Sequence, residues 1–106
     1  MKLNIVIDDQ SRDIDVPEEV LRDGQEFFNK MDADMDRGWQ MGPEFIENPD
    51  PIQRCQIAAD KILTAIDTEN QNLLILMAGY ILSRQPQVSR IDINTSGEVL
   101  ETLIRQ

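Results

Sequence analysis

The sequence predicts a single α+β domain over residues 1–106, in which about three helices pack against a small, mostly antiparallel sheet. Near both ends of the chain hydrophobic residues alternate with other residues, as they do in half-buried strands. Between about residues 17 and 85 they recur at helical spacing instead. With 106 residues, 41% of them hydrophobic and 28% charged, the chain has ordinary globular composition and enough length for one core.

Two short strands are expected at the start of the chain. In residues 3–7 and again in residues 13–16, every second residue is a large aliphatic one. The polar residues 9–12 connect the two segments. This alternation around a polar connection predicts an N-terminal β-hairpin.

A first helix is expected from Pro17 to about Asp36. Proline suits the first helical position, and the acids Glu18 and Glu19 follow where the helix dipole favours negative charge. Gly24 lies within the hydrophobic stripe and weakens the helix by about 1 kcal/mol relative to alanine. We therefore expect another element to approach closely there. The stripe consists of Val20, Leu21, Phe27, Phe28, Met31 and Met35.

A connecting loop and a second helix follow. Residues 37–50, RGWQMGPEFIENPD, have no sustained period, and we expect a loop with one helical turn at residues 43–46. Asp50, Pro51 and Gln53 then form a capping-box signature at the start of a helix. Its buried face extends from Ile52 to Ile66.

The third helix is expected to be the most buried. Thr68 and Gln71 resemble a second capping box, and residues 73–82 are hydrophobic all round. This run has half the ~20 residues that a membrane-spanning helix requires. The alternative is that it packs against a second copy of the chain, with Gly79 allowing close contact.

The C-terminal segment is ambiguous. Val88, Ile91 and Ile93 predict a strand. The residues after it match either a helix capped by Thr95 or a hairpin that turns at residues 96–97. We favour the hairpin.

Charge narrows the class of partner. The formal net charge is −10, and residues 1–50 carry 14 acidic and five basic residues, whereas residues 51–106 carry six and five. Nucleic acids and anionic membranes both require a basic face, so the composition argues against them and favours a protein partner with a basic surface. Because the chain has one cysteine and no signal-like start, the expected location is the cytoplasm.

Few residues are suited to catalysis. The chain has no histidine, which excludes Ser-His and Cys-His pairs and histidine metal ligands. Cys55 falls on the hydrophobic stripe of a helix and is interpreted as an inert packed thiol. No glycine-rich phosphate-binding loop occurs. We therefore expect a protein that is not an enzyme and holds no cofactor.

The sharpest local feature is the alternation of Asp32, Asp34 and Asp36. With Glu44 these residues resemble part of a calcium-binding loop, although Gly38 and Glu44 each come one position late. In a continuing helix, Asp32 and Asp36 share a face and Asp34 points away, so the three cannot converge on one ion. The other interpretations are a solvated helix end and a contact with a basic partner.

The aspartates are followed by the large side chains Trp39, Met41 and Phe45, which either roof the core or anchor a partner. Our hypothesis is a non-catalytic interaction or regulatory module that acts through residues 32–45, with Asp32, Asp34, Asp36, Trp39, Met41 and Phe45 binding the partner. The alternatives are a Ca²⁺ or Mg²⁺ binding protein and a nucleic-acid mimic that uses the N-terminal acids. Self-association as a homodimer is a further alternative.

Overall fold

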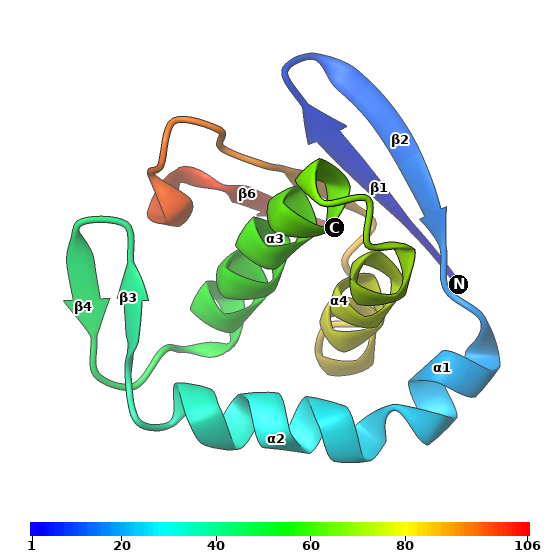
Figure 1. Cartoon of the computed structure of the whole chain (residues 1–106), viewed down its shortest axis with the longest axis horizontal. Helices are drawn as coiled ribbons and strands as arrows, with labels where there is room; N and C mark the ends of the chain where they lie inside the picture. Colours follow the sequence, from blue (N-terminus) through cyan, green and yellow to red (C-terminus); the bar gives the residue numbers. More distant parts are fainter.

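The computed structural model describes all residues from 1 to 106 and confirms the α+β class (Figure 1). A four-stranded sheet contains β1 (Lys2–Ile7), β2 (Gln10–Asp15), β5 (Arg90–Asp92) and β6 (Leu103–Arg105) in the order β2-β1-β5-β6. The β1-β2 and β5-β6 pairs are antiparallel, and β1 and β5 run parallel. The sheet is thus mostly antiparallel, as predicted.

The N-terminal hairpin is confirmed with a tighter turn. Asp8 and Asp9 alone connect β1 to β2, with φ angles of 49° and 68°. Two successive left-handed residues are typical of the two-residue turn whose twist matches that of paired strands, and aspartate tolerates this conformation. The expected connection at residues 9–12 was wrong because residues 10–12 pair with β1.

The first predicted helix is two helices, α1 (Glu18–Asp23) and α2 (Gln25–Met35), which meet at Gly24. A Cβ atom on Gly24 would lie 2.6 Å from the Val20 carbonyl oxygen and 2.9 Å from the Phe28 ring. The glycine is crowded, but by the turns on either side of it and not by another element as expected, and the chain bends at it. Figure 1 shows α2 lying across the molecule below α3 and α4.

Helices α3 (Pro51–Asp67) and α4 (Gln71–Arg84) pack side by side at the centre. The capping box of α3 is confirmed: Gln53 N donates to Asp50 Oδ1 at 2.8 Å, and Asp50 N donates to Gln53 Oε1 at 2.9 Å. The second predicted cap was wrong. Thr68 instead ends α3 as its C-cap, and Glu69 turns the chain with a positive φ of 55°. Asn70, two residues after the predicted position, caps α4 by accepting from Leu73 N at 3.1 Å.

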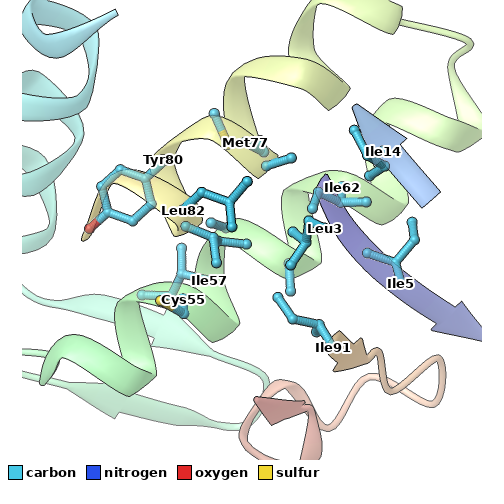
Figure 2. Close-up of a cluster of buried hydrophobic side chains, with 14 of the residues drawn as sticks. Leu3, Ile5, Ile14, Cys55, Ile57, Ile62, Met77, Tyr80, Leu82 and Ile91 are labelled. Atoms are coloured by element: carbon cyan, nitrogen blue, oxygen red, sulfur yellow. The ribbon is translucent and has the colours of Figure 1, made fainter. Parts of the chain in front are cut away.

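The core lies between the inner face of the sheet and the α3/α4 pair (Figure 2). Leu3, Ile5 and Ile91 project from the strands toward α3 and α4. Residues 77–82 of α4 are all buried, as the hydrophobic run predicted. A Cβ on Gly79 would lie 3.2–3.5 Å from side chains of this same chain, so Gly79 is not available to a second copy.

Residues 37–50 contain a second, separate hairpin. Strands β3 (Trp39–Met41) and β4 (Glu44–Ile46) pair antiparallel, so the expected helical turn at residues 43–46 was wrong. Gly42 supplies a φ of +63° at the turn, and a Cβ there would lie 2.7 Å from the Gly97 carbonyl oxygen, so glycine fits this position best. Trp39, Met41 and Ile46 face inward by register, which places Phe45 on the outer face.

The C-terminal segment returns to the sheet as predicted for a hairpin. Strand β6 pairs antiparallel with β5, but the connection spans residues 93–102 and includes a 3₁₀ turn, η1 (Val99–Glu101). Gln56 on α3 donates to the carbonyl oxygens of Leu100 and Thr102 and so anchors this connection. None of the helices has the length and hydrophobicity needed to cross a membrane.

Candidate functional site

The second half of α2 separates the three aspartates onto two sides of the helix. Because α2 remains helical to Met35 and Asp36 caps it, Asp32 and Asp36 lie one turn apart on the same face. Asp34 faces another side. The two sides have different surroundings.

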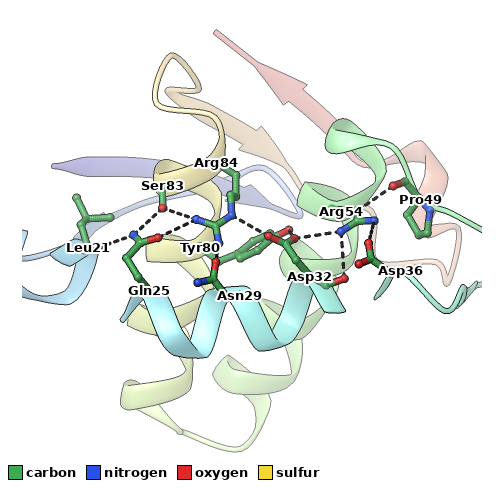
Figure 3. A network of polar contacts seen from close by, with 10 residues as sticks. All are labelled: Leu21, Gln25, Asn29, Asp32, Asp36, Pro49, Arg54, Tyr80, Ser83 and Arg84. Carbon is green, nitrogen blue, oxygen red and sulfur yellow. Dashed lines mark hydrogen bonds and ion pairs between the residues drawn. The ribbon is translucent and has the colours of Figure 1, made fainter. Parts of the chain in front are cut away.

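Asp32 joins three helices through its carboxylate (Figure 3). It accepts hydrogen bonds from Tyr80 Oη at 2.5 Å and Arg84 Nε at 2.9 Å, both on α4. It also accepts from Arg54 Nη1 on α3 at 3.2 Å. Tyr80 is only 1% exposed, and Asp32 retains 28% of its side-chain exposure. We call these four residues the Asp32 network.

The two arginines of the Asp32 network have little capacity left for a ligand. Arg54 donates from all three nitrogens, and Arg84 does the same. The other acceptors of Arg54 are the Asp32 and Pro49 carbonyl oxygens and the side chains of Asp36 and Asn48. Those of Arg84 are the side chains of Gln25, Asn29 and Ser83. The network therefore holds α2 against α3 and α4.

Electrostatics agree with a structural role. Burial raises the pKa of Asp32, but hydrogen bonds from Tyr80, Arg84 and Arg54 outweigh it, and the pKa falls below its ordinary value. Burial, reinforced by the hydrogen bond to Asp32, raises the pKa of Tyr80. Burial likewise raises the pKa of Cys55 to about 12, with a smaller contribution from the Asp32 charge. Asp32 therefore stays ionised at neutral pH, whereas the Tyr80 hydroxyl and the Cys55 thiol keep their protons.

A hollow of about 610 Å³ opens over the Asp32 network. Asp50, Pro51 and Gln85 line it together with residues of the network. Its size is that of a small-molecule site. However, the network groups that face it already bond to one another, and no buried side-chain nitrogen or oxygen lacks a partner. A ligand would have to displace these bonds, so the hollow alone does not indicate a binding site.

The structure does not assemble the cation site considered as an alternative. No group of three or more Asp, Glu, Cys or His side chains is placed to hold a metal ion. Asp32 and Asp36 accept from Arg54, Asp34 lies on another side of α2, and Glu44 lies in β4. The four proposed ligands therefore do not converge.

Asp34 and Trp39 come together on the other side of α2. They line a small hollow of about 40 Å³ with Met31, Met35 and Lys61. The Lys61 ammonium lies 4.9 Å from the centroid of the Trp39 ring, within the range of a cation-π contact. Trp39 is half-buried, so it supports the hairpin and also reaches the surface.

The β3-β4 hairpin divides the remaining predicted residues. Met41 is 1% exposed and packs into the core, so it supports the hairpin from beneath. Phe45 is 59% exposed and lies over Gly38, where a Cβ would come within 2.5 Å of its ring. The neighbouring Glu44 and Glu47 are both exposed. Of the six predicted partner-binding residues, three are exposed (Asp34, Asp36 and Phe45), two are partly exposed (Asp32 and Trp39), and Met41 is buried.

Sequence reasoning missed the partners of these residues. Arg54, Tyr80 and Arg84 lie 22 to 52 positions from Asp32 in the chain, and no local pattern links them to it. Phe27 was assigned to the buried stripe of the first helix but is 42% exposed. The bend at Gly24 could have indicated this, since a break in the helix changes which residues face the core.

The N-terminal acids that a nucleic-acid mimic would use are distributed over several elements. Asp8 and Asp9 form the β1-β2 turn, Asp13 and Asp15 lie on β2, and the remainder belong to α1 and α2. Arg22 on α1 pairs with Asp23 at 3.0 Å. This arrangement adds no observation in favour of the mimic.

Comparison of the chain with protein-family models, with curated proteins and with solved structures finds no match.

Proposed function

We propose that the protein is a non-catalytic interaction module that binds a protein with a basic surface. The contact is made by the acidic-aromatic surface, which we define as Asp34, Asp36, Trp39, Glu44, Phe45 and Glu47. The proposal rests mainly on the exposure of Phe45, which at 59% is the most exposed large hydrophobic residue of the chain.

The position of Phe45 supports a contact with another molecule. Its ring stands on the outer face of a two-stranded hairpin that lies apart from the main sheet (Figure 1). The inner face of the same hairpin is fixed by Met41 and Trp39, so the ring is presented on a supported element. Interface hot spots are typically aromatic side chains of this kind.

The charges around Phe45 support the basic character of the partner. Glu44 and Glu47 are exposed and have no ion-pair partner within 4 Å. Such carboxylates attract a cationic surface, increase the association rate and lose their effect as salt screens them. The net charge of −10 acts in the same direction at longer range.

Affinity capture from an extract of the source organism tests the proposal when matched variants are compared. The test variant combines Glu44→Gln, Phe45→Ser and Glu47→Gln, all at exposed positions, and leaves the buried Met41 and the half-buried Trp39 unchanged. The control variant combines Asp60→Asn and Asp67→Asn, which removes two charges from the exposed face of α3. We expect a protein that wild type and control retain and the test variant loses.

The captured protein must then bind in purified form. We expect its affinity to fall as ionic strength rises. The proposal is wrong if wild type and test variant capture the same proteins equally, or if the purified pair binds with the same affinity at low and high salt.

A further inference from the structure

A second surface, which shares only Asp34 with the acidic-aromatic surface, lies between α2 and the two central helices. Here Phe27 and Met31 of α2 and Leu73 and Met77 of α4 line a hollow of about 260 Å³. Lys30, Asp34 and Lys61 complete its lining. We call this hollow the helix groove. Its volume lies below the roughly 300–1,000 Å³ of small-molecule sites and suits a single large side chain.

Two lysines that form no ion pair line the helix groove. Ten residues are basic, and five of them, all arginines, pair with carboxylates of the same chain. Lys30 and Lys61 have no carboxylate within 4 Å and line the same hydrophobic hollow. In a protein of net charge −10, this combination fits a hydrophobic side chain flanked by acids.

The chain itself presents such a group. Phe45 stands on the β3-β4 hairpin with Glu44 before it and Glu47 two residues after it. We call these three residues the hairpin knob. The knob provides one aromatic ring and two carboxylates that form no ion pair. The helix groove provides one hydrophobic hollow, two ammonium groups with no carboxylate within 4 Å, and the carboxylate of Asp34. The two surfaces are complementary in the sign of their net charge, because the two lysines of the groove outnumber its one aspartate, and in size.

We propose that the protein forms a two-fold dimer in which each copy inserts its hairpin knob into the helix groove of the other. Phe45 fills the hollow beside Phe27 and Met31, and Glu44 and Glu47 face Lys30 and Lys61. Both surfaces come from every copy, so the dimer contains two identical contacts.

Adjacency of knob and groove favours a closed dimer over an open chain of molecules. The hairpin begins at Trp39, which shares a hollow with Met31, Asp34 and Lys61, and these three residues also line the helix groove. Knob and groove are therefore neighbours through the hairpin, whose inner-face residue Trp39 adjoins the groove and whose outer face carries Phe45. A two-fold axis between them makes both contacts at once, whereas surfaces at opposite ends would make a fibre.

This inference does not rest on the proposed function, because the knob fits the groove whether or not a basic partner exists. The two are coupled through Phe45, which the dimer would cover. Self-association would then compete with binding of the partner, and the dimer would have to dissociate before the partner could bind.

Sedimentation velocity and light scattering after size exclusion test the dimer directly. At about 0.15 M salt the Debye length is about 8 Å. Salt therefore screens the long-range repulsion between the two acidic molecules more than it screens the lysine–glutamate pairs in contact at the interface. We expect the mass to rise from monomer to dimer with concentration. Phe45→Ser should weaken the dimer about tenfold or more, as expected for an interface anchor.

A charge exchange identifies the contact. One variant carries Lys30→Glu with Lys61→Glu, and the other carries Glu44→Lys with Glu47→Lys. Each alone places like charges in both contacts and should stay monomeric at concentrations where wild type is dimeric. Mixed together, they should form a heterodimer, since each groove then meets a knob of opposite charge. Circular dichroism and denaturant midpoints establish that both variants are folded.

A wild-type protein that stays monomeric up to high micromolar concentration would overturn the proposal. So would a dimer that tolerates Phe45→Ser, or a mixture of the two charge variants that stays monomeric. The lysine variant also separates this inference from the proposed function. It lacks the groove charges but keeps the acidic-aromatic surface, so capture of a basic partner should persist in it.

Discussion

Replacing Asp32 by alanine is the perturbation that best tests the architecture, because one carboxylate connects α2 to both central helices. The substitution removes the acceptor of Tyr80 Oη, Arg84 Nε and Arg54 Nη1. It leaves two cations near one another without their common counter-ion. It also leaves the hydroxyl of a tyrosine that is 1% exposed without its partner.

The size of the effect follows from these contacts. Hydrogen bonds to a charged group contribute about 1.5–3 kcal/mol each, and contributions within one network do not add. Breaking a fully buried ion pair by removing one partner costs about 3–5 kcal/mol. Asp32 retains 28% side-chain exposure, so water replaces part of the loss, and we expect destabilisation of about 3 kcal/mol. This corresponds to a fall in Tm of roughly 12–24 °C for a domain of this size.

Denaturant unfolding followed by Trp39 fluorescence and circular dichroism measures the effect, and Asp34→Ala is the matched control. Asp34 lies two residues away on the same helix, is exposed and makes no hydrogen bond or ion pair through its side chain. We expect its removal to change the unfolding free energy by less than about 0.5 kcal/mol. If Asp32→Ala costs less than about 1 kcal/mol, or no more than Asp34→Ala, the network does not hold α2 as described.

Three further predictions follow from single residues. The pKa of Asp32 is lowered in the folded protein, so its contribution should be complete above about pH 5 and decline as pH falls below its unfolded value of about 3.9. The stability difference between wild type and Asp32→Asn, measured against pH, should therefore shrink only in acid. With a pKa of about 12, Cys55 should resist thiol reagents at pH 8 in native protein and react once it is denatured; rapid native labelling would contradict its burial. Gly24→Ala should destabilise the protein by about 1–3 kcal/mol despite the helix propensity of alanine, because the new Cβ would meet backbone at 2.6 Å; a gain in Tm would contradict this.

Sequence patterns correctly predicted the elements that are determined by residues close together in the chain. The capping box at Asp50 and Gln53 depends on residues three apart, and the buried run of α4 depends on one continuous segment. The β3-β4 hairpin was missed because strands of three residues are too short for an alternating pattern to stand out from a loop. The sequence predicted a close contact at Gly24 but not the break in the helix, because it does not show which atoms lie near the glycine.

The candidate site was predictable in part, because some of its features depend on residues that are close in the sequence and others on residues that are distant in it. Sequence analysis identified residues 32–45 from the alternating aspartates and from the large hydrophobic side chains that follow them. It also separated Asp34 from Asp32 and Asp36 by helix geometry. It could not find Arg54, Tyr80 or Arg84, because these donate hydrogen bonds to Asp32 from helices far away in the chain. An acid surplus in the sequence is therefore not a measure of free acid on the surface.

The two sides of α2 have consequences for how binding must be studied. Asp32 and Asp36 face Arg54 and maintain the position of the helix, whereas Asp34 lies near Trp39 and lines the helix groove. A variant that replaces all three aspartates would loosen α2 before it tested any contact with a partner. Loss of binding in that variant would then report on folding. Asp34 and Phe45 do not belong to the Asp32 network. Substitutions at these two residues therefore change the surface and leave the network in place.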